Sequence, residues 1–273
     1  MAGSAPDTTG FAPVNGTVLW YEIAGRGPPV VLIHGANLDA RMWDAQFALL
    51  ARTHRVLRYD VRGFGRSGPA DAPYSSTDDL LALLRYAGIE RASFVGLSLG
   101  GRIAIDFALA HPTMVDRLVL ASHGLSGWKW APEPADAPWR VAAHAALARH
   151  DTTSVALAWL QSDYMRPAME HPALAARLRV LAEGGAGYWA SLLRHGDLER
   201  PASPPALGRL AAIRVPTLVI VGSRDIPDIR AIADTIVADV TGAKKLVLDG
   251  SGHMTNLEAP RRFAAALQGC LGR

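Results

Sequence analysis

At 273 residues the chain exceeds the usual size of one domain, but α/β folds of this length commonly form a single domain around one sheet. Hydrophobic residues make up 49% of it and charged residues 19%, which supplies a large core and argues against disorder. The net charge of +3 comes almost entirely from scattered arginines, whereas a nucleic-acid-binding protein would show a clustered basic stripe. We therefore expect no nucleic-acid partner.

The number of cysteines and the length of the apolar runs indicate a cytoplasmic protein. The single cysteine, Cys270, allows no disulfide within the chain, so nothing demands an oxidising environment. Residues 1–15 have neither a basic start nor an apolar run and do not read as a signal peptide. The longest apolar runs, such as 30–33 and 217–221, are too short to cross a bilayer. We expect a cytoplasmic protein with no membrane partner, and the sequence says nothing of its oligomeric state.

The first predicted element is a β-hairpin. Residues 11–14 and 17–23 flank Asn15-Gly16, the dipeptide best suited to a type I′ turn. Short apolar runs then alternate with helical stretches. Because these runs are continuous, both faces of each strand are expected to be covered, as in a parallel sheet between helices. The predicted strands are 29–33, 55–59, 92–95, 117–121, 217–221 and 244–248, and the predicted helices are 76–87, 100–110, 229–240 and 260–271.

The stretch 127–205 breaks this alternation. It has no strand-like run, is rich in Ala, Leu and Arg at helical spacing, and contains five of the seven tryptophans. We predict a helical insertion over the sheet. The expected division is an α/β core formed by 1–126 and 206–273, with a helical cap at 127–205.

The strongest chemical signal is the G-x-S-x-G motif formed by Gly96, Ser98 and Gly100 between a predicted strand and a predicted helix. That context is typical of a nucleophile elbow. The sharp turn strains the serine backbone by about 1–3 kcal/mol, and glycines make it possible because side chains there would collide with the neighbouring chain. The motif predicts a serine hydroxyl presented at the start of a helix.

A serine hydroxyl needs a general base and a carboxylate that orients this base. His253 follows the last predicted strand after a glycine, and Asp225 follows the strand 217–221. The order Ser98, Asp225, His253 is the α/β-hydrolase order. Asp228 is the competing carboxylate. Asp225 is favoured because it lies closer to the strand end.

Negative charge that develops on the substrate oxygen requires pre-aimed donors. We expect the backbone N–H of Leu99, directly after the nucleophile, to be one of them. The second is assigned to the N–H of Ala36, in the loop after strand 29–33, with Asn37 as the alternative. His34 is interpreted as a residue that shapes this loop.

With these motifs in place, the chain resembles the α/β-hydrolase superfamily, above all its small cofactor-free esterases, enol-lactonases and carbon–carbon-bond hydrolases. The stretches 31–35, 60–67 and 252–260 carry further likeness. The resemblance implies a mostly parallel eight-stranded sheet flanked by helices, a helical cap after the sixth strand, and no cofactor or metal. It also implies that 60–67 is a structural loop beside the site.

The residue types at two positions narrow the chemistry that the resemblance implies. Ser98 stands where halide-removing and epoxide-opening relatives carry aspartate, which argues against both reactions. Ser122, His123 and Gly124 follow the strand 117–121, where some relatives place the triad carboxylate, so Asp225 is favoured further.

We expect acyl transfer from a small to medium apolar ester or lactone through an acyl-enzyme on Ser98. Two alternatives remain open: a carbon–carbon-bond hydrolase that uses the same triad, and a non-hydrolytic, receptor-like protein that keeps the fold as a ligand cup. Tyr164 and Met165 are among the residues of the insertion that could line an apolar pocket, although most of its aromatic residues are expected simply to pack its helices. The proposed substrate contacts are Asn37, His123, Trp128, Trp159, Tyr188 and Trp189.

Overall fold

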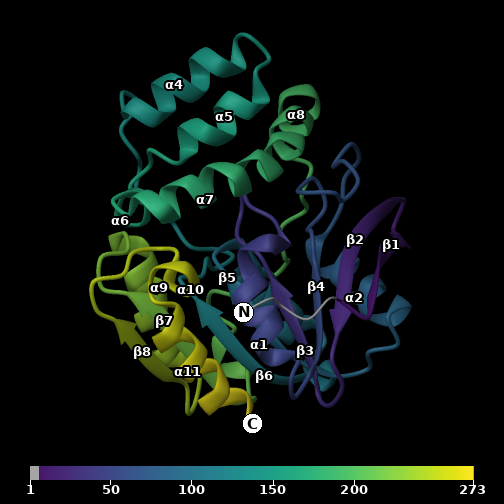
Figure 1. Ribbon diagram of the computed structural model, residues 1–273. Helices are drawn as coiled ribbons and strands as arrows, with labels where there is room; N and C mark the ends of the chain where they lie inside the picture. The colour runs from purple at the N-terminus through teal and green to yellow at the C-terminus, as the bar shows by residue number, and fades with distance from the viewer. Residues whose placement is uncertain (1–5, 273) are drawn as a thin grey trace.

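The computed structural model describes residues 6–272, which contain an eight-stranded sheet (Figure 1). The strands follow the order β1-β2-β4-β3-β5-β6-β7-β8, in which β2 is antiparallel to its neighbours β1 and β4 and all other neighbouring pairs are parallel. The predicted fold class is therefore confirmed. The strands are β1 (Thr8–Val14), β2 (Thr17–Ala24), β3 (Pro29–Ile33), β4 (Arg55–Tyr59), β5 (Ala92–Leu97), β6 (Val115–Ala121), β7 (Thr217–Gly222) and β8 (Lys244–Leu248).

The hairpin forms around the predicted turn. Asn15 and Gly16 have φ angles of 41° and 78°, and Val14 pairs with Thr17. Positive φ at both central residues is what a type I′ turn requires. The first strand begins at Thr8, three residues before the predicted start at 11, because its outer half is largely exposed and carries no apolar signal.

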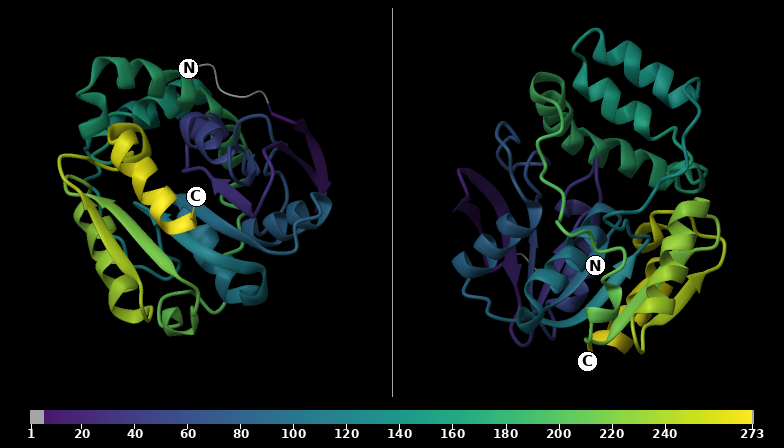
Figure 2. Two further views of the ribbon diagram at one scale, coloured as in Figure 1. Left: turned by 60° about the horizontal axis from the view of Figure 1, so that its bottom comes forward. Right: turned by 180° about the vertical axis from the view of Figure 1, so that it is seen from behind.

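Helices cover both faces of the sheet (Figure 2). Helices α2, α3 and α9 pack on one face, and α1 and α11 pack on the other. The short α1 and α10 were not predicted, because one or two turns show too little periodicity. The helices of the core are α1 (Asp44–Leu50), α2 (Ser76–Tyr86), α3 (Leu99–Ala110), α9 (Pro227–Asp239), α10 (Thr255–Glu258) and α11 (Pro260–Leu271), with 3₁₀ turns at Ala40–Trp43, Pro112–Met114 and Leu210–Ala212.

The two-sided burial explains the continuous apolar strands. In β3, Val31 and Ile33 belong to the cluster under α2, α3 and α9, whereas Val30 and Leu32 belong to the cluster under α1 and α11. Successive side chains of a strand point to opposite faces, so both sets must be apolar when helices cover both.

Between β6 and β7 the chain forms a group of helices that stands over the carboxyl ends of the parallel strands (Figure 1). We call residues 127–205 the helical insertion. Its α4 and α5 share a small apolar cluster of their own, centred on Ala143, Ala146 and Val155. Its helices are α4 (Pro138–Leu147), α5 (Thr152–Trp159), α6 (Arg166–Met169), α7 (Pro172–Ala182) and α8 (Ala186–His195), with a 3₁₀ turn at Glu183–Gly185.

Both ends of the helical insertion are attached to core helices. At its start, the Trp128 indole and the Ala131 amide donate to Asp228 of α9, at 2.9 and 3.1 Å. At its end, Glu199 pairs with Arg102 of α3 at 2.6 Å. Across residues 6–272, no helix combines the length and apolar character needed to span a membrane.

Replacement of Leu32 by Ala tests the central packing. Leu32 is fully buried, so Leu32→Ala should lower the free energy of unfolding by about 2–5 kcal/mol through lost burial and a cavity. Val247→Ala, on edge strand β8 with 43% of the side chain exposed, is the control and should cost under about 1 kcal/mol. Denaturant titration of both variants measures the difference, and equal losses would contradict this account of the core.

Candidate active site

The turn between β5 and α3 places Ser98 in a strained backbone conformation, with φ of 54° and ψ of −114°. A Cβ atom at Gly96 would lie 2.3 Å from the Gly100 carbonyl oxygen, and one at Gly100 would lie 2.1 Å from the Ile33 carbonyl oxygen. No side chain fits at either position. The glycines of the motif therefore allow the close approach of β5, α3 and the end of β3 that the sequence predicts.

Hydrogen bonds from the neighbouring strand end fix this turn. The Ser98 amide donates to the Ala121 carbonyl, and the Gly124 amide donates to the Ser98 carbonyl, each at 3.0 Å. The half-buried Ser98 lies directly before the first residue of α3, Leu99. The positive end of the helix dipole thus lies beside the hydroxyl.

His253 and Asp225 form a buried pair. Imidazole Nδ1 lies 3.1 Å from both carboxylate oxygens, and the exposed fractions of the two side chains are 2% and 0%. The Ile226 amide also donates to the carboxylate at 2.8 Å. A carboxylate that accepts from Nδ1–H leaves Nε2 as the basic nitrogen.

The loop that carries His253 folds back across the strand ends. A Cβ at Gly222 would lie 2.1 Å from the Gly252 carbonyl oxygen, so this loop crosses directly over the end of β7. Further along, the Asn256 side chain donates to the Met42 carbonyl at 3.0 Å, which ties the same segment to the chain after β3. Within the described residues, the Ser98 hydroxyl forms no hydrogen bond with the His253 ring, a contact that often tightens only when substrate binds.

The two candidate carboxylates have different partners. Asp225 contacts His253, whereas Asp228 accepts from Trp128 and Ala131 of the helical insertion. Asp228 is the second residue of α9, whereas Asp225 precedes this helix, and the Asp228 carboxylate is directed at the insertion. Of the two carboxylates, Asp225 is the one that lies against His253.

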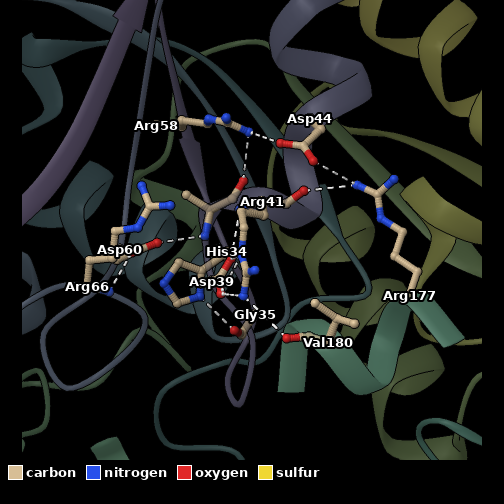
Figure 3. A network of polar contacts seen from close by, with 11 residues as sticks. His34, Gly35, Asp39, Arg41, Asp44, Arg58, Asp60, Arg66, Arg177 and Val180 are labelled. Atoms are coloured by element: carbon tan, nitrogen blue, oxygen red, sulfur yellow. Dashed lines mark hydrogen bonds and ion pairs between the residues drawn. The ribbon is translucent and has the colours of Figure 1, made fainter. Parts of the chain in front are cut away.

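His34 is held by two backbone contacts, and Figure 3 includes the one to Gly35. Its Nε2 accepts from the Val61 amide at 2.9 Å, so Nδ1 carries the proton and donates to the Gly35 carbonyl at 2.8 Å. With both nitrogens engaged, His34 shapes the loop after β3, as predicted. A Cβ at Gly35 would lie 3.4 Å from the Ser98 Cβ, so this loop runs against the nucleophile and brings Ala36 into its neighbourhood.

Charged groups hold the remainder of that loop (Figure 3). The Asp60 carboxylate accepts from the Ala40 and Arg66 amides at 2.8 and 2.9 Å, and burial raises its pKa. Arg41 pairs with Asp39 at 2.7 Å and also donates to a carbonyl of α7. The loop thus links the core to the helical insertion.

Four of the proposed substrate contacts are aromatic residues of the insertion, and each has a packing or hydrogen-bond partner within the described residues. Trp159 packs on the core cluster under α1 and α11, Trp189 packs against α4 and α5, and Trp128 donates to Asp228. Tyr188 stacks on Phe64 of the core, with ring centroids 4.7 Å apart. Most of these aromatic residues therefore have packing roles in the structure. Asn37, another proposed substrate contact, is buried, has a φ angle of 60° and packs against Gly185 of the insertion.

His123 is almost completely enclosed, with 1% of its surface exposed. Its Nδ1 lies 3.2 Å from the Gly124 carbonyl, and its buried Nε2 has no hydrogen-bond partner among the described residues. A Cβ at Gly101 would lie 2.3 Å from the His123 Cβ, so a glycine is needed to seat this ring. Burial lowers the pKa of His123 to about 4.

Tyr164 is the insertion residue that contacts the histidine. Its ring lies edge-on to the His253 ring, with centroids 5.0 Å apart and an angle of 75° between the planes. The sequence marks it only as one aromatic residue among many. No spacing rule could have identified the contact, because Tyr164 and His253 are far apart in the chain.

Replacement of Gly100 by Ala tests the tight turn. The added Cβ would overlap the Ile33 carbonyl, so we expect Gly100→Ala to lower the free energy of unfolding by more than about 2 kcal/mol. Gly269→Ala is the matched control, because nothing lies within 4 Å of a Cβ in that helix and the change should stabilise by up to about 1 kcal/mol. Denaturant unfolding distinguishes the two, and a neutral Gly100→Ala would refute the steric argument.

The enclosed His123 predicts a pH dependence of stability. Its pKa falls from an ordinary 6.5 to about 4 on folding, so the unfolded chain binds more protons between these values. The neutral His123 therefore contributes up to about 3 kcal/mol to the free energy of unfolding above pH 6.5, and this contribution is lost as the pH falls towards 4. Unfolding free energies measured at pH 7.5 and 4.5 should differ less in His123→Gln than in the wild type. An equal pH dependence would show that His123 does not titrate in this way.

Comparison with known proteins places the chain in a family. The Alpha/beta hydrolase family model matches residues 30–266. A pimeloyl-[acyl-carrier protein] methyl ester esterase from Edwardsiella ictaluri is 30% identical over 92% of this chain and 95% of its own length. A hydrolase structure from Pseudomonas aeruginosa is 32% identical, with a TM-score of 0.77 over 98% of this chain and 99% of its own. The enol-lactonase structure from Burkholderia xenovorans LB400 is 29% identical, with a TM-score of 0.76 over 96% and 99%. The chain therefore belongs to the alpha/beta hydrolase family, in the group that contains these esterases and enol-lactonases.

Proposed function

We propose that the protein is a serine hydrolase that cleaves a small to medium apolar carboxylic ester or lactone through an acyl-enzyme on Ser98. The observation that carries this proposal is the buried contact between His253 and Asp225, on loops that fold over the strand ends where Ser98 lies. The esterases and enol-lactonases among the relatives support the same class of substrate.

In the first step, His253 Nε2 accepts the Ser98 proton while the serine oxygen attacks the carbonyl carbon. Asp225 stabilises the resulting imidazolium through Nδ1. The Leu99 and Ala36 amides are the proposed donors to the oxyanion. The Gly35 amide faces Met42 Sδ at 3.3 Å, which leaves the next amide of the loop for this role.

The tetrahedral intermediate then collapses as His253 returns the proton to the leaving alkoxide. Water, deprotonated by the same nitrogen, attacks the acyl-enzyme and releases the acid and the free serine. In a lactone the leaving alkoxide stays joined to the acyl group, so one hydroxy acid is the product.

We further propose that residues 127–205 act as a cap that selects the substrate. The segment stands over the strand ends and is attached to the loop after β3 by Arg41 and Arg177 (Figure 3). Three candidate substrate contacts remain. Asn37 and Tyr188 lie where the insertion meets the core, since Asn37 packs against Gly185 and Tyr188 stacks on Phe64. His123 follows β6.

Replacement of Ser98 by Ala tests the nucleophile. Hydrolysis of p-nitrophenyl butyrate by Ser98→Ala should fall by about 10⁶-fold, because the remaining groups cannot form the acyl-enzyme. A fluorophosphonate probe should label the wild type at Ser98 and leave the variant unlabelled, as peptide mapping by mass spectrometry will show. Wild-type turnover by Ser98→Ala would dispose of the proposal.

The paired aspartates supply the control. Asp225→Asn removes the carboxylate that selects the histidine tautomer and should lower kcat by about 10⁴-fold. Asp228→Asn, three residues away and directed at the insertion, should lose far less. The reverse order would assign the catalytic carboxylate to Asp228.

A further inference from the structure

A short segment of the helical insertion touches both loops that carry the proposed catalytic pair. We call residues 164–170, which comprise Tyr164, Met165 and α6 with its C-terminal Glu170, the α6 clamp. Figure 1 shows α6 at the base of the insertion, beside α9 and α10. Three of its residues make contacts that converge on His253 and Asp225.

The first contact is the aromatic one. The edge-on arrangement of Tyr164 and His253 has the geometry that aromatic pairs prefer. The imidazole is almost fully enclosed, so this ring forms part of the wall that fixes its plane. A histidine that must both accept and return a proton depends on that plane being held.

The second contact lies one residue earlier in the same loop. A Cβ at Gly252 would lie 2.6 Å from Pro167 Cγ, so α6 packs directly on the backbone that precedes His253. On its other side this backbone is held by Glu258, whose carboxylate accepts from the Gly252 and Met254 amides at 2.7 and 2.8 Å. The histidine loop is thus confined between α6 and α10.

The third contact reaches the other loop. The Glu170 carboxylate accepts two hydrogen bonds from Arg224, at 2.8 and 2.7 Å, and Arg224 precedes Asp225. This pair is exposed, so it contributes little to stability, but its two-point geometry defines an orientation.

The clamp is itself anchored in the core. Met165 and Ala168 are fully buried in the cluster that also contains β7 and β8 residues. Helices α4 and α5, in contrast, have an apolar cluster of their own. The clamp therefore belongs mechanically to the core, although the chain reaches it through the insertion.

From these contacts we propose that the α6 clamp positions the catalytic base, with Tyr164 as the positioning residue that holds the His253 imidazole. This inference rests on the proposed function. It gives the insertion a second task besides substrate selection: one part of it completes the catalytic geometry. The expected signature is a loss in kcat and not in KM, because the ring orientation affects the reaction and not the binding of the ester.

Substitutions of Tyr164 test the proposal on p-nitrophenyl butyrate. Tyr164→Ala should lower kcat by about 10- to 100-fold, with KM changed by less than about threefold. Tyr164→Phe keeps the ring edge and should restore kcat to within about threefold of the wild type. Tyr164→Leu provides the same comparison if the Ala variant does not fold. Val141→Ala, at an exposed position of α4 that has no part in the clamp, is the control and should leave both constants unchanged.

Two results would overturn the proposal. One is a rise in KM at unchanged kcat in Tyr164→Ala, since that assigns the ring to the substrate wall. The other is unchanged deuterium uptake by residues 250–256 of this variant, measured by hydrogen-exchange mass spectrometry, where the clamp predicts faster exchange. The second readout needs no turnover, so it tests the clamp even if Ser98→Ala shows that the proposed function is wrong.

Discussion

The close approach of three backbone segments at the end of β5 determines the geometry of the site. At Gly96 and Gly100 there is no space for a side chain, because the backbones of β5, α3 and the end of β3 approach one another closely. This contact forces Ser98 into its strained conformation at the carboxyl edge of the sheet. Loops after β3, β6, β7 and β8 end at the same edge, and every other feature of the site is arranged around that point.

Buried polar contacts, and not loop rigidity alone, hold those loops in place. Asp60 accepts from the Ala40 amide after β3, and His34 accepts from the Val61 amide after β4. Glu258 accepts from two amides of the loop after β8. His34 and Asp60 are buried and Glu258 is partly buried. Leaving one of these amides without a partner would cost more free energy than the hydrogen bond contributes. These contacts therefore resist small displacements of the loops around Ser98, which the proposed acyl transfer requires to be fixed.

Much of this arrangement was predictable because it depends on local patterns. The continuous apolar strands, the Asn15-Gly16 turn and the G-x-S-x-G motif each have a period or spacing that the sequence displays. Contacts between distant segments have no such signature. Neither the hydrogen bond from Trp128 to Asp228 nor the contact of Tyr164 with His253 follows from the spacing of these residues in the chain. Short helices such as α1 could not be predicted from the sequence for a related reason: tertiary contacts stabilise them, and they are too short to show a periodic pattern.

The attachment of the helical insertion at both ends has a consequence for how this scaffold can vary. Asp228 of α9 binds the start of the insertion, and Arg102 of α3 binds its end. Both helices pack on the same face of the sheet. Between these attachments, α4 and most of α5 pack in an apolar cluster of their own, so this part of the span depends least on the core. A change of sequence confined to α4 can therefore preserve both attachments and the contacts of residues 164–170 with the loops after β7 and β8.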